Sequence, residues 1–165
     1  MNLGTDASTS LGILGGTFDP PHIGHLIAAQ DVQAALAGAE GFDLSDVELR
    51  RAGPSYSVDT LRQLGASNPG ATLFFIIGAD QFRELHTWHA PDEVARLAHL
   101  VVMHRDNLSP EAMESPLDVD YQTVRVTRVD VSSTLIRQRV KARRPIRFLV
   151  HAAVEEIIRR EGLYG

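Results

Sequence analysis

The feature that most constrains this chain is a glycine turn followed by two histidines: residues 15–25 read Gly-Gly-Thr-Phe-Asp-Pro-Pro-His-Ile-Gly-His. A short apolar run over residues 11–14 precedes the turn and predicts a strand. Glycines let the backbone approach a ligand closely, and the prolines stiffen the entry to a helix, which we expect from His22 to about Leu36. His22 and His25 would then lie one turn apart beside the positive end of the helix dipole, where amides and imidazoles bind phosphate.

Other phosphate-binding motifs do not fit these residues. A Walker loop needs a Lys followed by Ser or Thr, and the dinucleotide fingerprint needs Gly-x-Gly-x-x-Gly. A single histidine or a Gly-Gly pair is usually structural, but their joint occurrence after a strand favours a nucleotide site. The tetrapeptide His-Ile-Gly-His also resembles class I aminoacyl-tRNA synthetases, which need a second Lys-Met-Ser-Lys-Ser-type loop and a much longer chain; neither is present here.

Composition narrows the class of protein. A length of 165 residues fits a single domain over residues 1–165 that can bury a real core. Sixteen basic and twenty-one acidic residues give a formal net charge of -5, so we expect no nucleic-acid partner. The absence of cysteine, of a signal peptide and of a long apolar run indicates a cytoplasmic protein with no membrane partner. The composition is also compatible with a homo-oligomer.

Strand and helix patterns alternate along the chain. Runs at 72–77 and 100–103 are apolar on both faces, as buried parallel strands are. A last strand is expected at 124–126 and a short one at 44–49, with helices over 58–64, 90–97, 132–142 and 152–160. This alternation predicts an α/β fold, a Rossmann-like doubly wound parallel sheet. In the first helix, Leu26 and Val32 are expected to face the core.

Two further segments contain residue types suited to nucleotide chemistry. Gly78 and Asp80 follow the apolar run 72–77, at the sheet edge where open α/β folds bind ligands. Capping of the next helix is an equally good interpretation of Asp80. Trp88 is the only tryptophan, and a place in the core is the commoner role for such a residue. The two histidines beside it lack a third ligand, so we expect no metal site there.

A third cluster lies at the start of the helix expected near residue 132. It comprises Ser132, Ser133, Thr134 and Arg137. Hydroxyls and free amides at a helix N-terminus, with an arginine one turn further on, can hold a polyphosphate. Alone, this pattern is typical of a capped surface helix; together with the paired histidines it predicts the second side of a triphosphate clamp.

These segments together resemble bacterial nicotinate-nucleotide adenylyltransferases, members of the nucleotidyltransferase superfamily with its (His/Thr)-x-Gly-His signature. The resemblance rests on five blocks: 15–25, 48–51 with 53–61, 74–80 with Trp88, 131–137, and 144–147 with 162–164. Pantetheine-phosphate adenylyltransferases share the first block and a serine-rich one near the end. They lack the Pro-Ser-Tyr block and the Gly-Ala-Asp block with its tryptophan.

The resemblance implies transfer of AMP from ATP to nicotinate mononucleotide, which gives deamido-NAD and pyrophosphate in NAD biosynthesis. It implies that Mg²⁺ enters with the triphosphate, and that His22, His25 and Arg137 are catalytic. It places ATP against Gly15, Gly16, Thr17, Phe18, Gly24, Gly78, Asp80, Ser132, Ser133 and Thr134. It places the mononucleotide against Ser57, Trp88 and His89. The alternatives are a phosphopantetheine acceptor and a catalytically silent nucleotide-binding module.

One departure from the family concerns the end of the first helix. The family normally has a second strand, a basic proline-containing loop and another helix before the segment that matches 47–49. Here Ala37 and two further small residues follow Leu36 at once. We expect that this strand, loop and helix are absent between Leu36 and Ala37, either from the sequence as given or from the protein itself. The basic loop helps to bind the mononucleotide phosphate, so its loss would weaken transfer more than ATP binding.

Overall fold

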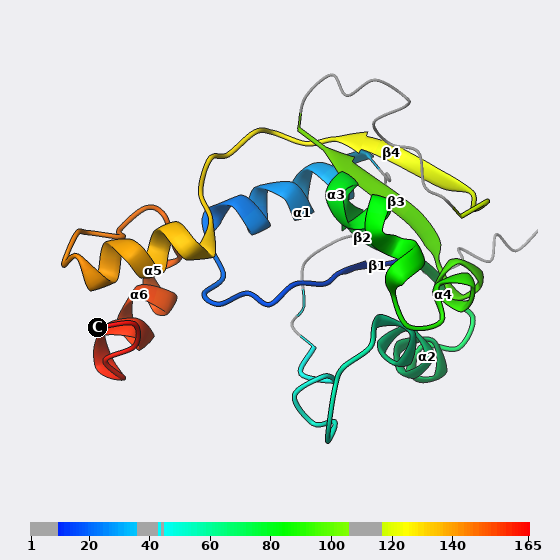
Figure 1. The fold of residues 1–165 in the computed structure, drawn as a ribbon, viewed down its shortest axis with the longest axis horizontal. Coiled ribbons are helices and arrows are strands. Elements are labelled where there is room, and N and C mark those ends of the chain that lie inside the picture. The colour runs from blue at the N-terminus through cyan, green and yellow to red at the C-terminus, as the bar shows by residue number, and fades with distance from the viewer. Residues whose placement is uncertain (1–9, 36–42, 44, 106–116) are drawn as a thin grey trace, which may run out of the picture.

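The computed structural model describes residues 10–35, 43, 45–105 and 117–165. Its centre is a sheet of four strands in the order β1-β2-β3-β4, with every neighbouring pair parallel (Figure 1). The strands are β1 (Ser10–Leu14), β2 (Thr72–Gly78), β3 (His99–His104) and β4 (Tyr121–Arg125). The predicted parallel α/β sheet is confirmed, and β1 is an edge strand in the described part of the chain.

The middle strands are apolar on both sides because both faces of the sheet are covered. In β2, Phe75 and Ile77 belong to one core and Ile76 to the other, as the alternation of side chains along a strand requires. Helix α1 (Ile23–Ala35) covers the second face, where Val32 is fully buried against Ile76. The expectation for Leu26 is wrong: this residue is 49% exposed, because α1 meets the sheet core through Val32.

The opposite face of the sheet is covered by three helices: α2 (Ser57–Ser67), α3 (Ala79–Glu84) and α4 (Pro91–Leu97). They supply the buried side chains Val58, Leu61, Phe82 and Val94 to the core around Phe75. Helices on both faces of a parallel sheet are the arrangement that the sequence predicts. No helix in the described ranges is long and apolar enough to span a membrane.

Helices α5 (Ser133–Lys141) and α6 (Ala152–Arg160) form a third packing unit. Their core contains Ile136, Ile146, Val150 and Ile158. Figure 1 shows both helices to one side of the sheet, next to the start of α1. The contact is anchored by the backbone N–H of Ile23, which donates to the carbonyl of Leu149 at 3.0 Å.

Two short segments differ from the expectations. Residues 47–50 form a turn where the sequence predicts a strand. Asp46 accounts for this difference, because its carbonyl accepts from the backbone N–H of Leu49 at 2.9 Å and its carboxylate pairs with Arg50 at 2.8 Å. Helix α3 follows β2 directly and leads into the 3₁₀ helix η1 (Leu85–Thr87). The sequence patterns gave no bounds for either element. The junction of Leu36 and Ala37 lies outside the described residues.

Candidate active site

The loop that follows β1 brings its two histidines to the start of α1, as predicted. His22 directly precedes the helix and is 6% exposed, whereas His25 lies in the first turn. The two imidazole rings stack with their centroids 3.7 Å apart and their planes inclined by 21°. The ring of Phe18 packs edge-on against His25 with the centroids 4.9 Å apart. The rings of Phe18, His22 and His25 therefore form one compact cluster at the start of α1.

A hydrogen bond within the pair determines which ring nitrogen of His25 carries the proton. The backbone N–H of His22 donates to Nδ1 of His25 at 3.2 Å. A neutral imidazole has one donor and one acceptor nitrogen, so this bond assigns the ring proton of His25 to Nε2. The Nδ1 atom of His22 is buried without a hydrogen-bond partner in the described part of the chain.

Burial keeps both histidines uncharged at neutral pH. It lowers the pKa of His22 from 6.5 to about 4, and the neighbouring His25 and the positive charge of Arg105 lower this pKa further. Burial also lowers the pKa of His25, again assisted by Arg105. The pair can therefore donate N–H groups to a phosphate, but it does not supply positive charge itself.

Glycines at this site leave room for neighbouring side chains. A Cβ at Gly24 would lie 3.1 Å from the His22 ring, and one at Gly16 would lie 3.2 Å from the Phe18 ring. At the end of β2, a Cβ at Gly78 would lie 2.5 Å from the carboxylate of Asp80, which is closer than real side chains approach. The glycines of the motif thus make space for the side chains beside them, and Gly15 and Thr17 leave the loop backbone exposed.

The serine cluster is placed against the same loop. Ser132 caps α5, because its Oγ accepts from the backbone N–H of Leu135 at 3.1 Å. The hydroxyl of Ser133 donates to the carbonyl of Pro20 at 2.9 Å. Arg137 donates from Nη1 to the carbonyl of Asp19 at 2.6 Å, and its Nη2 donates to the hydroxyl of Thr134 at 3.2 Å. Two segments more than a hundred residues apart in sequence therefore meet at one place.

Two residues at this contact were missed by the sequence reasoning. The carboxylate of Asp19 lies 3.7 Å from Nη1 of Arg137 and accepts a hydrogen bond from the phenol of Tyr164. Both residues lie in blocks that the sequence singles out, Asp19 in the glycine turn and Tyr164 in the last block. Their pairing could not be read from those blocks, because 145 positions separate them.

Asp80 lies in the first turn of α3, past the carboxyl end of β2. The backbone N–H of Gly78 donates to the side chain of Gln81 at 3.3 Å. Gln81 therefore performs the capping role that was considered for Asp80, and no cap bond from Asp80 is present. Its carboxylate stays exposed at the sheet edge where ligands of this fold class bind.

The residues expected on the mononucleotide side come from α2 and from the segment after η1. Trp88 is partly buried, with its ring edge-on to Phe75 at a centroid distance of 6.2 Å. The exposed ring of His89 packs on Tyr56 at 4.4 Å, and Ser57 follows Tyr56 as the first residue of α2. Tyr56 thus joins Ser57 and His89 into one surface. This role of Tyr56 was not predicted.

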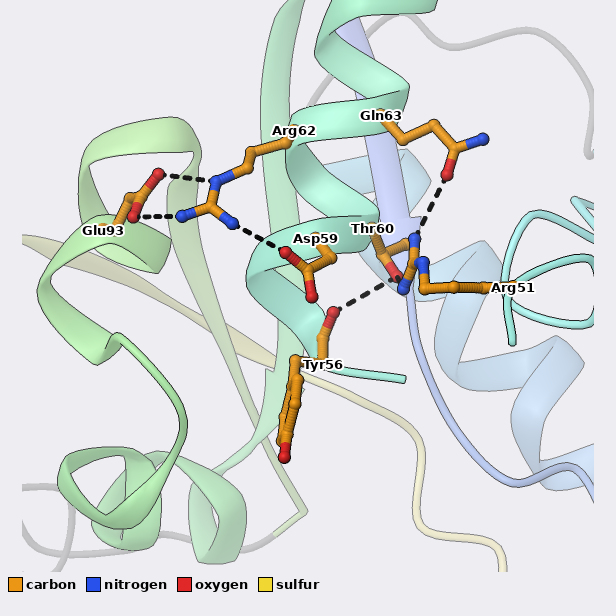
Figure 2. Close-up of polar contacts among 7 residues, drawn as sticks. All are labelled: Arg51, Tyr56, Asp59, Thr60, Arg62, Gln63 and Glu93. Carbon is orange, nitrogen blue, oxygen red and sulfur yellow. Dashed lines mark hydrogen bonds and ion pairs between the residues drawn. The ribbon is translucent and has the colours of Figure 1, made fainter. Parts of the chain in front are cut away.

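A polar network holds the start of α2 in place (Figure 2). Arg62 donates to both carboxylate oxygens of Glu93 in α4, at 2.7 and 2.6 Å, and to Asp59 at 2.6 Å. On the other side of α2, Arg51 donates to Thr60 at 3.3 Å and to Gln63 at 3.2 Å. Because the Arg62 side chain is 47% exposed, its pairs contribute little stability. Their geometry nevertheless connects α2, which begins at Ser57, to α4.

Metal-ligating side chains are dispersed. No group of three or more His, Asp or Glu residues close enough to hold a metal ion occurs within the described ranges. The carboxylates of Asp19 and Asp80 come from separate segments, the loop after β1 and the first turn of α3. A divalent ion in this site would need most of its oxygen ligands from a bound phosphate chain and from water.

The sequence is similar to known adenylyltransferases. Residues 30–139 match the family model described as cytidylyltransferase-like. The chain is 38% identical over 190 residues to a protein of Geobacillus thermodenitrificans and 34% identical over 189 residues to one of Saccharopolyspora erythraea; both are named "probable nicotinate-nucleotide adenylyltransferase". The two matches cover 94% and 93% of this chain, and 86% and 89% of the relatives.

The lengths of these matches are informative in themselves. The first alignment extends over 190 positions, whereas this chain has 165 residues in all. The relative therefore has residues inside the matched region for which this chain has no counterpart.

The fold is similar to that of Plasmodium falciparum nicotinic acid mononucleotide adenylyltransferase. The TM-score is 0.70 for its complex with NaAD and 0.66 for its complex with APC, at 15% and 14% sequence identity. Each comparison covers 94% of this chain and 97% of the other.

Proposed function

This chain belongs to the nicotinate-nucleotide adenylyltransferase family, and on that premise we propose that AMP is transferred where the loop after β1 meets the start of α5. The enzyme joins nicotinate mononucleotide to the AMP part of ATP and so forms deamido-NAD. The observation that supports this location is the pair of hydrogen bonds from Ser133 to Pro20 and from Arg137 to Asp19. They bring the hydroxyls and guanidinium of α5 beside the paired histidines.

In the reaction, a phosphate oxygen of the mononucleotide forms a bond to the α-phosphorus of ATP. The bond between that phosphorus and the oxygen that bridges to the β-phosphorus breaks, and pyrophosphate leaves with the electron pair. The attacking phosphate is already ionised at neutral pH, so the protein needs no nucleophile and no strong base. Catalysis consists of positioning the substrates and stabilising charge on the phosphates.

The residues at the contact have distinct roles in this proposal. His25 donates its Nε2 proton to a phosphate oxygen, since its Nδ1 is occupied by the backbone of His22. His22 donates from its own ring, and Arg137 supplies the positive charge that the neutral histidines lack. Ser132, Ser133 and Thr134, together with the amides at the start of α5, hold the outer phosphates.

The remaining predicted residues bind the other parts of the substrates. Asp80 binds the adenosine ribose, and Gly78 leaves space for its carboxylate. Trp88 stacks on the nicotinate ring, while Ser57 and His89 lie beside its carboxylate. The edge-on contact with Phe75 supports the role of Trp88, because it orients an indole that is only partly buried.

Mg²⁺ is proposed to arrive with ATP. The dispersed carboxylates of the described residues fit an ion that takes its ligands mainly from the triphosphate and water. When bound, such an ion neutralises charge on the phosphates and so assists the departure of pyrophosphate.

The proposal is tested by pyrophosphate release from ATP with nicotinate mononucleotide or phosphopantetheine as the acceptor. Release that depends on nicotinate mononucleotide, with deamido-NAD as the second product, is the expected result, at the low rate that follows from the segment expected to be absent after Leu36. Release that depends only on phosphopantetheine would assign the other acceptor. ATP binding without release in either case would identify a catalytically silent module.

A further inference from the structure

Residues near the end of the chain contact, through Asp19, the proposed phosphate clamp, by which we mean His22, His25, Ser132, Ser133, Thr134 and Arg137. The phenol of Tyr164 donates to one carboxylate oxygen of Asp19, and the other oxygen lies 3.7 Å from Nη1 of Arg137. The same nitrogen donates to the Asp19 carbonyl at 2.6 Å. Asp19 therefore connects the end of the chain to the arginine that is proposed to hold the triphosphate.

Tyr164 is held firmly in this position. It packs against the core between α5 and α6, and the backbone N–H of Leu163 donates to the carbonyl of Ile158 at 3.0 Å. Its φ of 66° lies in the left-handed region, which residues other than glycine rarely adopt and which costs free energy. The hydrogen bond to Asp19 raises the pKa of Tyr164, so the phenol keeps its proton as a donor.

The position of the Asp19 carboxylate matters because it is an anion next to Arg137. A carboxylate that is free to turn would form a bidentate pair with the guanidinium, and that pair would compete with a phosphate for the same N–H groups. In the structure, Arg137 instead uses one N–H for the Asp19 carbonyl and one for Thr134. Apart from the ion pair of 3.7 Å with the Asp19 carboxylate, its other N–H groups remain for a ligand.

We propose that Tyr164 is a positioning residue of the phosphate clamp: it limits the Asp19 carboxylate to an ion pair of 3.7 Å with Arg137 and prevents a bidentate pair, so that the guanidinium stays available to the triphosphate. This inference rests on the proposed role of Arg137. It assigns a function in ATP binding to a residue that acts through Asp19.

The test is ATP affinity, measured by calorimetry in the absence of the mononucleotide, for Tyr164→Phe and for the control Tyr121→Phe. Tyr121 lies in β4 and packs on Phe82, so the control removes a hydroxyl away from the clamp. Tyr164→Phe should weaken ATP binding about tenfold, because ATP must then displace the Asp19 carboxylate from Arg137, a competition on the order of one hydrogen bond to a charged group. The control and the KM for the mononucleotide should remain unchanged.

A second background separates positioning from a general loss of structure. In Asp19→Asn the competing charge is gone, so Tyr164→Phe should have no further effect on ATP affinity. Unchanged affinity in the single variant, or an equal loss in the Asp19→Asn background, would overturn the proposal. So would an equal rise of both KM values. Because the calorimetry measures ATP binding alone, failure of AMP transfer in the unmodified enzyme would be recognised separately.

Discussion

The backbone N–H of His22 donates to Nδ1 of His25 at 3.2 Å, and the two rings stack with centroids 3.7 Å apart. This arrangement leaves the Nε2 proton of His25 directed away from the pair. Two stacked imidazolium ions would repel each other, so the geometry is suited to neutral rings. In the proposed site, phosphate binding therefore depends on directed N–H groups, and Arg137 adds positive charge.

The neutral state of His22 predicts a pH-dependent stability. Its folded pKa of about 4 lies below the ordinary 6.5, so the unfolded chain binds this proton more tightly. The stability that neutral His22 contributes is therefore fully present above pH 6.5. It is lost as the pH falls toward 4, which lowers the free energy of unfolding by up to about 3 kcal/mol. Urea unfolding over this range should show the loss in the unmodified protein and a clearly smaller loss in His22→Gln. Parallel curves would mean that His22 titrates normally in the folded state.

His25→Ala should lower kcat by on the order of a hundredfold or more, because it removes one preorganised donor to the reacting phosphates. Stability should change little, since the ring is only partly buried. Steady-state kinetics and thermal unfolding would be compared with His86→Ala, an exposed histidine whose Nδ1 lies 3.0 Å from the carbonyl of Arg83. Turnover close to that of the control would remove His25 from the mechanism.

Trp88 should determine affinity for the mononucleotide. Trp88→Ala is expected to raise the KM for nicotinate mononucleotide far more than the KM for ATP, because in the proposed site the indole stacks on the pyridine ring and not on ATP. Since Trp88 also packs on Phe75, Trp88→Phe serves as a milder variant that retains an aromatic ring. If both KM values rise together in the folded variants, the indole is a packing residue only.

A fourth prediction concerns the segment that we expect to be absent between Leu36 and Ala37. Two observations support it: β1 is paired on one side only among the described residues, and the alignment with the Geobacillus relative is longer than this chain. The protein with the printed sequence should bind ATP but transfer AMP very slowly. Insertion of the corresponding segment of that relative should increase transfer with little effect on ATP affinity. Full activity without the insertion would show that the segment is dispensable.

Local patterns in the sequence were sufficient to predict most of the fold. The runs at 72–77 and 100–103 became β2 and β3, because a strand buried on both faces needs apolar residues at consecutive positions. The helix expected over 152–160 became α6, and Ser132 became the cap of α5. Short-range periodicity and capping depend on neighbouring residues, so they can be recognised directly in the sequence. The prediction of a strand at 44–49 is wrong, because the backbone N–H of Leu49 donates to the carbonyl of Asp46 and closes a turn.

The sequence alone determined which residue types surround the proposed phosphate site: the glycine turn, the two histidines and the serine cluster with its arginine. The tertiary structure decided how these groups act. Burial made the histidines neutral, and packing of α5 and α6 beside α1 brought Arg137 and Tyr164 to Asp19. Such effects depend on contacts between residues more than a hundred positions apart, and no local pattern encodes them. The type of chemistry was therefore fixed by short motifs, whereas the charge and hydrogen bonding of the site were fixed by packing.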